Sequence, residues 1–271
     1  MKVVLFCGGA GMRMREASEK IPKPMVSVGS RPILWHVMKY YAHFGHRDFI
    51  LCLGWQANVI KDYFLHYEES VSNDFVLHGN GKGVELLSSD IDDWNITFVD
   101  TGIKANIGQR LMKVRPFLEG EGTFLANYTD GVSDLDLPSL VKAHREHEAV
   151  ATFVSVRPQQ SFHLVDHAEG GRVSRIKTIS QSDVWMNGGF FVLEQGIFDH
   201  IHDGEDLVLE PFERLIQQNA LYTVRHNGFW GCMDTFKEKQ ALDDRVARGD
   251  APWELWNQDG PVADGGGEAR S

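Results

Sequence analysis

Short apolar runs alternate with amphipathic stretches through the first 150 residues, and this alternation constrains the fold more than any other feature of the chain. It predicts strands at 3–7, 49–53, 95–99, 123–127 and 150–156, and helices at 32–44, 59–67 and 137–147. A repeated order of strand, helix and strand is typical of a mainly parallel sheet that is covered by helices on both faces. We therefore expect an α/β fold of three layers.

The second half of the chain has a weaker pattern. It predicts strands at 164–166, 173–176 and 188–193, a turn at 169–171, and helices at 207–218 and 236–248. The last residues are rich in Gly, Asp and Ala and offer little to bury. We expect a single domain over 1–256, in which 151–256 form a smaller C-terminal elaboration, and a disordered tail over 257–271.

The composition excludes two classes of partner. The formal charge is −11 at pH 7, whereas nucleic acids and anionic membranes attract a basic surface, so we expect neither as a partner. The three cysteines are too few and too far apart for a disulfide framework or a zinc site. The first apolar run ends at Gly8, too early for a signal peptide, and no run approaches the roughly 20 apolar residues that span a bilayer. These features predict a cytoplasmic protein in a reducing compartment.

A glycine-rich segment follows the first predicted strand directly. It reads Gly8-Gly9-Ala10-Gly11-Met12-Arg13, and the main chain at such glycines can approach a phosphate closely. The spacing matches neither the Walker A loop nor the dinucleotide fingerprint, so a plain turn after a strand is the alternative interpretation.

Lys23 lies between two prolines, Pro22 and Pro24. Proline restricts its own backbone and that of the preceding residue, which favours an extended segment that could hold a cation over a phosphate. A solvated lysine is the alternative interpretation.

Further motifs follow in order along residues 1–256. They are Pro22-Lys23-Pro24-Met25, Gly29-Ser30-Arg31-Pro32, Trp94-Asn95-Ile96, Gly108-Gln109-Arg110, Asp130-Gly131-Val132, Asn187-Gly188-Gly189, Met233-Asp234-Thr235 and Ala251-Pro252-Trp253. With the glycine-rich segment, they resemble the nucleotide sugar pyrophosphorylase superfamily and, within it, the glucose-1-phosphate cytidylyltransferases. The resemblance implies the Rossmann-like nucleotide-diphospho-sugar transferase fold, with 1–150 mainly nucleotide-binding and 151–256 mainly sugar-binding. It also implies transfer of a nucleotidyl group to a sugar 1-phosphate, with Mg²⁺ as cofactor. The resemblance to the cytidylyltransferases implies that this group is CMP and that it comes from CTP.

The resemblance also implies roles for residues of the nucleotide half. Gly8, Gly9 and Gly11 match the loop that wraps the nucleotide phosphates. Arg13 matches the arginine that contacts the leaving pyrophosphate, and Lys23 matches the lysine near the α-phosphate.

Other implied site residues lie further along the chain. Arg110 matches the arginine of a Gly-Gly-Arg segment in the nucleotide site, although Gln109 replaces the second glycine. Asp130 and Asp234 match two aspartates that bind the metal, and Asn187 and Gly189 match the lining of the sugar pocket. Apart from the resemblance, an Asp before a glycine is most often a turn residue, but the position of Asp130 after a predicted strand favours a ligand site. Asp234 before a predicted helix is equally an N-cap.

The sugar half departs from the family pattern. The family's Glu-Lys-Pro, whose lysine binds the sugar phosphate, should fall near Thr178, where this chain reads Arg175-Ile176-Lys177-Thr178. Lys177 and Arg175 are the candidate replacements, although both would face the opposite side of a strand from Thr178. An acceptor other than glucose 1-phosphate, whose additional groups supply the binding, is the hypothesis that follows.

Three functions therefore stay open. They are a cytidylyltransferase acting on glucose 1-phosphate or a related sugar, the same reaction with another NTP or an unusual sugar phosphate, and a non-catalytic nucleotide-binding relative. The resemblance further implies a homo-oligomer, for which Trp253 and Trp256 are candidate contact residues.

Overall fold

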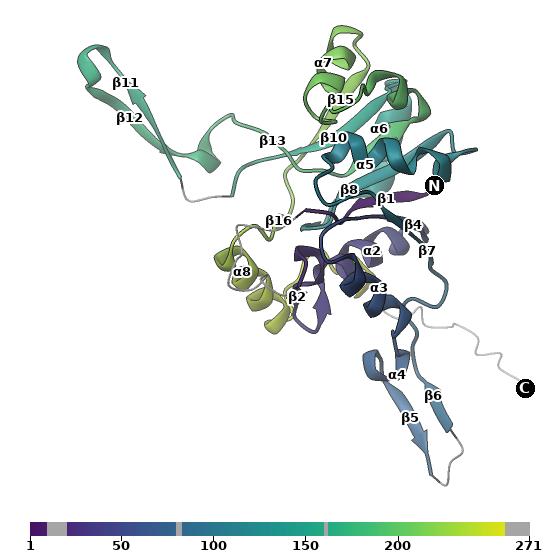
Figure 1. The fold of residues 1–271 in the computed structure, drawn as a ribbon. Helices are drawn as coiled ribbons and strands as arrows, with labels where there is room; N and C mark the ends of the chain where they lie inside the picture. The colour runs from purple at the N-terminus through teal and green to yellow at the C-terminus, as the bar shows by residue number, and fades with distance from the viewer. Residues whose placement is uncertain (10–20, 80–82, 160–161, 258–271) are drawn as a thin grey trace, which may run out of the picture.

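The computed structural model describes residues 1–9, 21–79, 83–159 and 162–257 (Figure 1). Two predicted site residues, Gly11 and Arg13, lie outside these ranges, as does the predicted tail beyond residue 257. No helix within the described ranges is long and apolar enough to cross a bilayer.

A mixed, mainly parallel sheet forms the centre of the molecule (Figure 1). Its strands are, in order, β15 (Leu221–His226), β10 (Ala151–Val156), β14 (Phe191–Glu194), β8 (Thr123–Tyr128), β1 (Val3–Phe6), β4 (Asp48–Leu53) and β7 (Asn95–Asp100). Strands β8, β1, β4 and β7 are parallel, β10 is parallel to β15, and β14 is antiparallel to both of its neighbours. The short β13 (Met186–Asn187) pairs with the end of β10 beyond β14. The predicted α/β fold is confirmed.

Helices cover both faces because successive residues of a strand face opposite sides. On β1, Val3 and Leu5 enter one core cluster, whereas Val4 and Phe6 enter the other. The first cluster includes residues of α2 (Ile33–His43), α3 (Ala57–Leu65) and α6 (Leu137–Glu146), and the second includes residues of α5 (Ile107–Val114) and α7 (Glu210–Gln217). Three layers result, as predicted.

Strand direction decides where a ligand can bind. Because β14 is antiparallel to both β8 and β10, strands β10 and β15 run in the same direction as β8. The carboxyl ends of β1, β8, β10 and β15 therefore share one edge of the sheet. In open α/β sheets, ligands bind at this edge.

Two predicted elements were wrong in extent. The strand predicted at 188–193 begins only at Phe191, because Gly189 and Phe190 have positive φ angles of 79° and 53°, which an extended strand does not allow. The helix predicted at 207–218 begins at Glu210, with Pro211 in its first turn. The pattern also gave no sign of α4 (Glu69–Ser72) or of the hairpin of β5 (Phe75–His78) and β6 (Gly83–Leu86).

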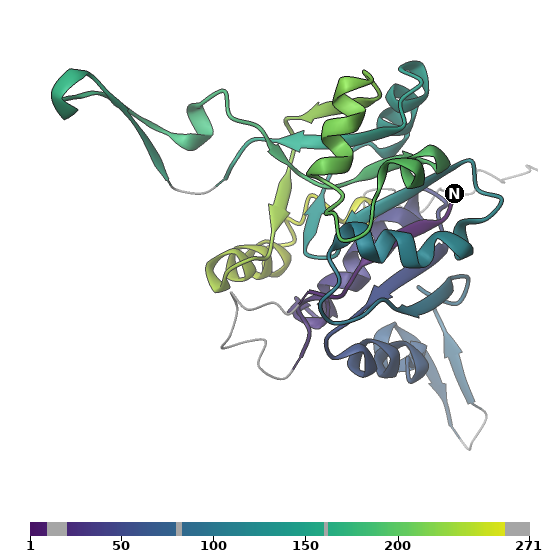
Figure 2. The ribbon, with the colours of Figure 1, turned by 45° about the horizontal axis from the view of Figure 1, so that its top comes forward.

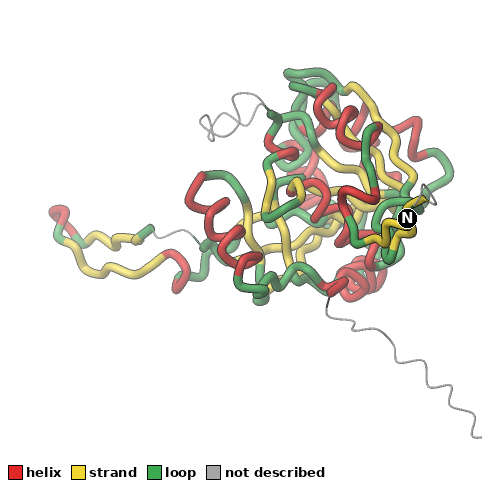
Figure 3. Tube along the Cα trace, turned by 90° about the horizontal axis from the view of Figure 1, so that it is seen from below, coloured by secondary structure: helices red, strands yellow, loops and turns green. Residues whose placement is uncertain are grey.

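Strands β11 (His163–His167) and β12 (Val173–Thr178) form a second hairpin, which confirms the strands predicted there. This β11–β12 hairpin projects well away from the central sheet, at the left of Figures 1, 2 and 3.

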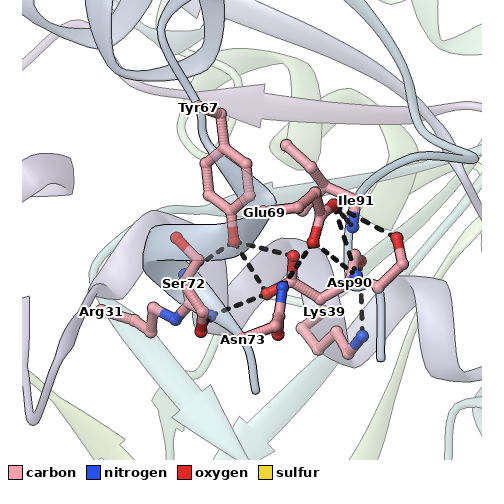
Figure 4. A network of polar contacts seen from close by, with 9 residues as sticks. Arg31, Lys39, Tyr67, Glu69, Ser72, Asn73, Asp90 and Ile91 are labelled. Atoms are coloured by element: carbon pink, nitrogen blue, oxygen red, sulfur yellow. Dashed lines mark hydrogen bonds and ion pairs between the residues drawn. The ribbon is translucent and has the colours of Figure 1, made fainter. Parts of the chain in front are cut away.

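A polar network fastens α4 and the segment after β6 to the start of α2 (Figure 4). The carboxylate of Asp90 accepts hydrogen bonds from Arg31 Nη2 at 3.0 Å and from Tyr67 Oη at 2.7 and 2.8 Å. Glu69 accepts from the main-chain N–H of Asp90 and Ile91. Asp90 is buried with these partners, so its desolvation is offset. Arg31, which belongs to one of the motifs, therefore has a structural role.

The C-terminal tryptophans pack on the chain's own core. Trp253 is only 1% exposed, stacks on Phe229 at 5.4 Å and donates from Nε1 to His36 Nδ1 at 3.3 Å. Trp256 packs edge-on against Trp35 at 5.7 Å. The prediction that Trp253 contacts another subunit was wrong, because its side chain is already enclosed within one chain.

We predict that Trp253→Ala lowers the free energy of unfolding by about 3–5 kcal/mol, since it removes a fully buried aromatic side chain. Urea denaturation measures the change, and Trp256→Ala, which removes a partly buried ring, should cost less. An unaltered unfolding free energy in Trp253→Ala together with an altered molecular mass in solution would contradict the intramolecular role.

Candidate functional site

A cavity of about 420 Å³ opens at the carboxyl edge of the sheet. Its lining includes six of the predicted site residues: Gly8, Gly9, Lys23, Arg110, Asp130 and Asp234. These residues come from segments up to 226 positions apart in the sequence, from Gly8 to Asp234.

The ammonium group of Lys23 lies between two carboxylates. Nζ is 2.5 Å from Oδ2 of Asp130 and 2.6 Å from Oδ1 of Asp234. Burial alone would lower the pKa of Lys23, but the two aspartates outweigh it and the pKa is raised. Lys23 is therefore a cation throughout the neutral pH range.

A short two-stranded ladder brings the two aspartates together. Strand β9 (Gly131–Ser133) follows Asp130 directly and pairs antiparallel with β16 (Trp230–Cys232), which precedes Asp234 by one residue. The main-chain N–H of that residue, Met233, donates to the carbonyl of Asp130 at 2.8 Å. Asp130 thus leaves the carboxyl end of β8 with its position set by the main chain.

Helix α8 (Phe236–Ala247) is capped by Thr235 and not by Asp234. The Thr235 side chain accepts from the N–H of Glu238 at 3.2 Å, and Glu238 accepts in return from Thr235 N at 2.8 Å. The alternative of Asp234 as the N-cap was therefore wrong. Its carboxylate contacts Lys23 in the cavity instead.

Lys23 enters the cavity from a rigid turn. The 3₁₀ turn η2 (Lys23–Met25) begins after Pro22, whose carbonyl accepts from Met25 N at 2.8 Å, and Pro24 is buried. The two prolines restrict this segment, as the sequence indicated, but they do so in a helical turn and not in an extended segment.

Arg110 holds the main chain at Gly8 through hydrogen bonds. Its buried guanidinium donates to the carbonyls of Gly8 at 2.9 Å and Leu53 at 3.1 Å, and to Oγ1 of Thr101 at 2.6 Å. A Cβ at Gly8 would lie 1.9 Å from Nη1 of Arg110, so a larger residue there would displace the guanidinium from these hydrogen bonds. Gly9, in contrast, faces open space.

The predicted sugar residues lie beside the cavity and do not line it. Asn187 is exposed at the end of β13, where its Oδ1 accepts from Gly189 N at 2.9 Å. Gly189 has a φ of 79°, and a Cβ there would lie 2.4 Å from Oδ1 of the buried Asn127, which itself accepts from Phe190 N at 2.9 Å. Close packing and backbone conformation both require glycine at position 189.

Lys177 and Thr178 are on the projecting β11–β12 hairpin, paired with Leu164 and His163 respectively. Lys177 is not among the residues that line the cavity. Within this chain, the structure does not bring it to Lys23 and the two aspartates.

Four lining residues with amide, hydroxyl or carboxyl groups belong to none of the motifs: Asn106, Tyr128, Thr129 and Asp206. Tyr128 and Thr129 directly follow the strand predicted at 123–127, so the rule that ligands bind at carboxyl ends could have indicated them. Asn106 begins α5 in a capping box with Gln109, the residue that replaces the family's glycine. Asp206 lies in a loop that no local pattern distinguishes.

The donor set favours one kind of metal. Within the described ranges, no three His, Cys, Asp or Glu side chains come together. Asp130 and Asp234 nevertheless already share one cationic group, so their oxygens can face a single positive centre. Two carboxylates suit Mg²⁺, which keeps several of its waters.

None of the three cysteines has the properties of a catalytic nucleophile. Cys7, Cys52 and Cys232 are free thiols. Burial raises the pKa of Cys7 well above its ordinary value and that of Cys52 and Cys232 to about 12, so none forms a thiolate readily.

Known proteins are similar to this chain in both sequence and fold. The nucleotidyl transferase family matches residues 2–237. The chain is 38% identical over 258 residues to glucose-1-phosphate cytidylyltransferase of Salmonella typhi, and 35% identical to the probable glucose-1-phosphate cytidylyltransferase of Bacillus subtilis. Both alignments cover 94% of this chain and the full length of the relative.

A solved structure shows the same fold at much lower identity. The putative glucose-1-phosphate thymidylyltransferase of Bacillus anthracis superposes with a TM-score of 0.65 at 14% identity, over 92% of this chain and 95% of its own. From the match over 2–237 and from full-length relatives above 30% identity, we conclude that this chain belongs to the nucleotidyl transferase family.

Proposed function

We propose that this protein transfers CMP from CTP to a sugar 1-phosphate, glucose 1-phosphate or a related sugar, with release of pyrophosphate. The relatives that align over their full length are glucose-1-phosphate cytidylyltransferases, which supports cytidylyl transfer here. In this reaction a phosphate oxygen of the acceptor attacks the α-phosphorus of CTP. The bond from the α-phosphorus to the bridging oxygen breaks, and pyrophosphate leaves with that oxygen.

The observation that carries the proposal is the grouping of Lys23, Asp130 and Asp234 beside the Gly8–Gly9 main chain. The reaction joins two anions, so it depends on neutralising and positioning charge and needs no covalent nucleophile. Lys23 supplies a cation. The exposed main chain at Gly9 leaves room for a phosphate chain to approach.

Asp130 and Asp234 would hold Mg²⁺ in this proposal. When bound, the metal neutralises charge on the phosphates of both substrates. Because the ammonium of Lys23 now contacts the same two carboxylates, it would move from them to a phosphate oxygen once the metal is present. Arg110 would keep the glycine segment in place throughout.

The cellular setting and assembly are also proposals. Three free thiols fit a reducing compartment such as the cytoplasm. The projecting β11–β12 hairpin exposes apolar side chains, including Ile176 at 62%, which fits a contact within a homo-oligomer.

Replacing either aspartate tests the metal assignment. We expect Asp130→Asn and Asp234→Asn each to abolish most turnover while the fold persists, since each keeps the side-chain shape and removes one formal charge from the metal site. Pyrophosphate release from CTP and glucose 1-phosphate across a Mg²⁺ titration measures this, with the exposed Asp183→Asn as the control. Near-normal rates in either site variant would remove that residue from the metal site. No product with CTP but product with another NTP would move the proposal to that base.

Replacing Lys23 tests whether metal and ammonium compete. In the parent, the ammonium occupies the carboxylate oxygens, and its raised pKa keeps the ion pair intact at neutral pH, to be lost only when the pH rises through that raised value. We therefore expect MgCl₂ to raise the Tm of Lys23→Met by more than it raises that of the parent or of the exposed Lys142→Met. We also expect Lys23→Met to lower kcat by about 10²–10³-fold. Equal Tm shifts in all three proteins would show that Mg²⁺ binds elsewhere.

A further inference from the structure

Beyond Tyr128, the sheet carries polar side chains that have no role in the reaction as proposed above. The inference drawn from them rests on that proposed function. From Tyr128 at the end of β8, the sheet continues through Asn187 on β13 to β10 and β15. Asn187 Nδ2 lies 3.4 Å from the hydroxyl of Tyr128, a cavity-lining residue. We call Tyr128, Asn187 and the carboxyl ends of β10 and β15 the acceptor row. An acceptor whose phosphate lies near Lys23 would extend along this row.

Two arginines and a tryptophan stand at the far end of the row. The guanidinium of Arg157 is 4.8 Å from the centre of the Trp185 ring, and that of Arg225 is 5.1 Å from the same centre. Arg157 Nη1 also donates to the carbonyl of Ser182 at 2.6 Å. Stacking holds both guanidiniums against the ring, and the hydrogen bond further fixes that of Arg157.

Strand register places this cluster on the same face of the sheet as Asn187. Ser155 of β10 pairs with Asn187 on one side and with Arg225 on the other. Asn187 and Arg225 therefore share one face, since both pair with the same residue. Arg157 directly follows β10 and Trp185 directly precedes β13, and the contact of Trp185 with Arg225 keeps the cluster beside that face. Three strand spacings of about 4.8 Å separate β15 from β8, which leaves room for a monosaccharide between Tyr128 and Arg225.

The cluster carries two positive charges without an acidic partner. Within the described ranges, no carboxylate forms an ion pair with Arg157 or Arg225. Both side chains are exposed at the carboxyl edge where the cavity opens. The guanidiniums lie 4.8 and 5.1 Å from the centre of one ring, so two positive charges are gathered in one region, and a bound anion would offset their repulsion. Guanidinium is well suited to bidentate binding of carboxylate or phosphate.

We propose that Arg157 and Arg225, stacked on Trp185, form an anion subsite for the acceptor. The favoured acceptor then carries a second anionic group, a carboxylate or a phosphate, at the end remote from the phosphate that attacks CTP. The guanidiniums bind this remote group and not the attacking phosphate, because their stacking holds them at the far end of the row. This chain has Thr178 where the family pattern places a phosphate-binding lysine. The anion subsite would compensate for the acceptor affinity that the missing lysine supplies.

The test compares acceptors that differ only in the second anion. We measure kcat/KM with CTP for glucose 1-phosphate, glucuronic acid 1-phosphate and glucose 1,6-bisphosphate. In the parent, we expect the kcat/KM of at least one of the two acceptors with a second anionic group to exceed that of glucose 1-phosphate by about 10-fold or more, as a charge-assisted contact allows. Whichever of the two is preferred identifies the group as carboxylate or phosphate.

Arg157→Gln and Arg225→Gln should each remove most of this preference, mainly through KM, and leave glucose 1-phosphate nearly unchanged. Arg115→Gln is the matched control, because Arg115 also stacks on an aromatic ring, Phe198 at 5.2 Å, but lies before β8 at the opposite edge of the sheet. Equal use of all three acceptors by the parent overturns the proposal. So does an equal loss for all three in the variants, which would place the arginines on the shared phosphate.

Failure of the proposed function has a different signature. If CTP yields no product with any acceptor, that function is wrong, and the subsite is tested by calorimetric titration instead. Tighter binding of glucuronic acid 1-phosphate or glucose 1,6-bisphosphate than of glucose 1-phosphate, abolished in Arg225→Gln, would support the subsite. Equal affinities for all three ligands would overturn it.

Discussion

The contact of one ammonium group with two carboxylates joins three parts of this chain that are far apart in sequence. Lys23 is separated from Asp130 by 107 positions and from Asp234 by 211. The strand end of β8, the proline-bounded turn η2 and the β9–β16 ladder must all be in place before the three charges can meet. Each charge is partly withdrawn from water, so each depends on the others to offset its desolvation. The same grouping that stabilises the resting site is the one that catalysis would rearrange.

The glycines of the site have distinct physical functions. Gly8 leaves space that the buried guanidinium of Arg110 fills, and this guanidinium binds the main chain around it. Gly189 is required by its positive φ and by its contact with Asn127. Gly9 has open space, which leaves the main chain accessible to a ligand. A rigid support thus lies beneath an accessible segment, as expected of a site that positions a flexible triphosphate.

The two halves of the site differ in how far they follow the family. The proposed nucleotide side keeps Lys23, Arg110, Asp130 and Asp234 around one cavity. The acceptor side lacks the expected lysine at Thr178, and its Lys177 is on a projecting hairpin. In its place the sheet edge presents Arg157 and Arg225 on Trp185. In the proposed reaction, the first half must offset the charge on the phosphate that is transferred, whereas the second half contacts the acceptor.

The sequence by itself determined the layer order, because the continuous apolar runs of β1, β4 and β8, which are buried on both faces, alternate along the chain with amphipathic helical stretches. It also indicated Lys23, Asp130 and Asp234 through short motifs. It could not indicate Asp206, or that Asp234 faces the cavity while Thr235 caps α8, because both depend on chain packing beyond any local window. The placement of Trp253 inside the core and the meeting of Arg157, Trp185 and Arg225 were likewise decided only by tertiary structure. Strand register brings such residues together across many intervening positions, and no local periodicity records it.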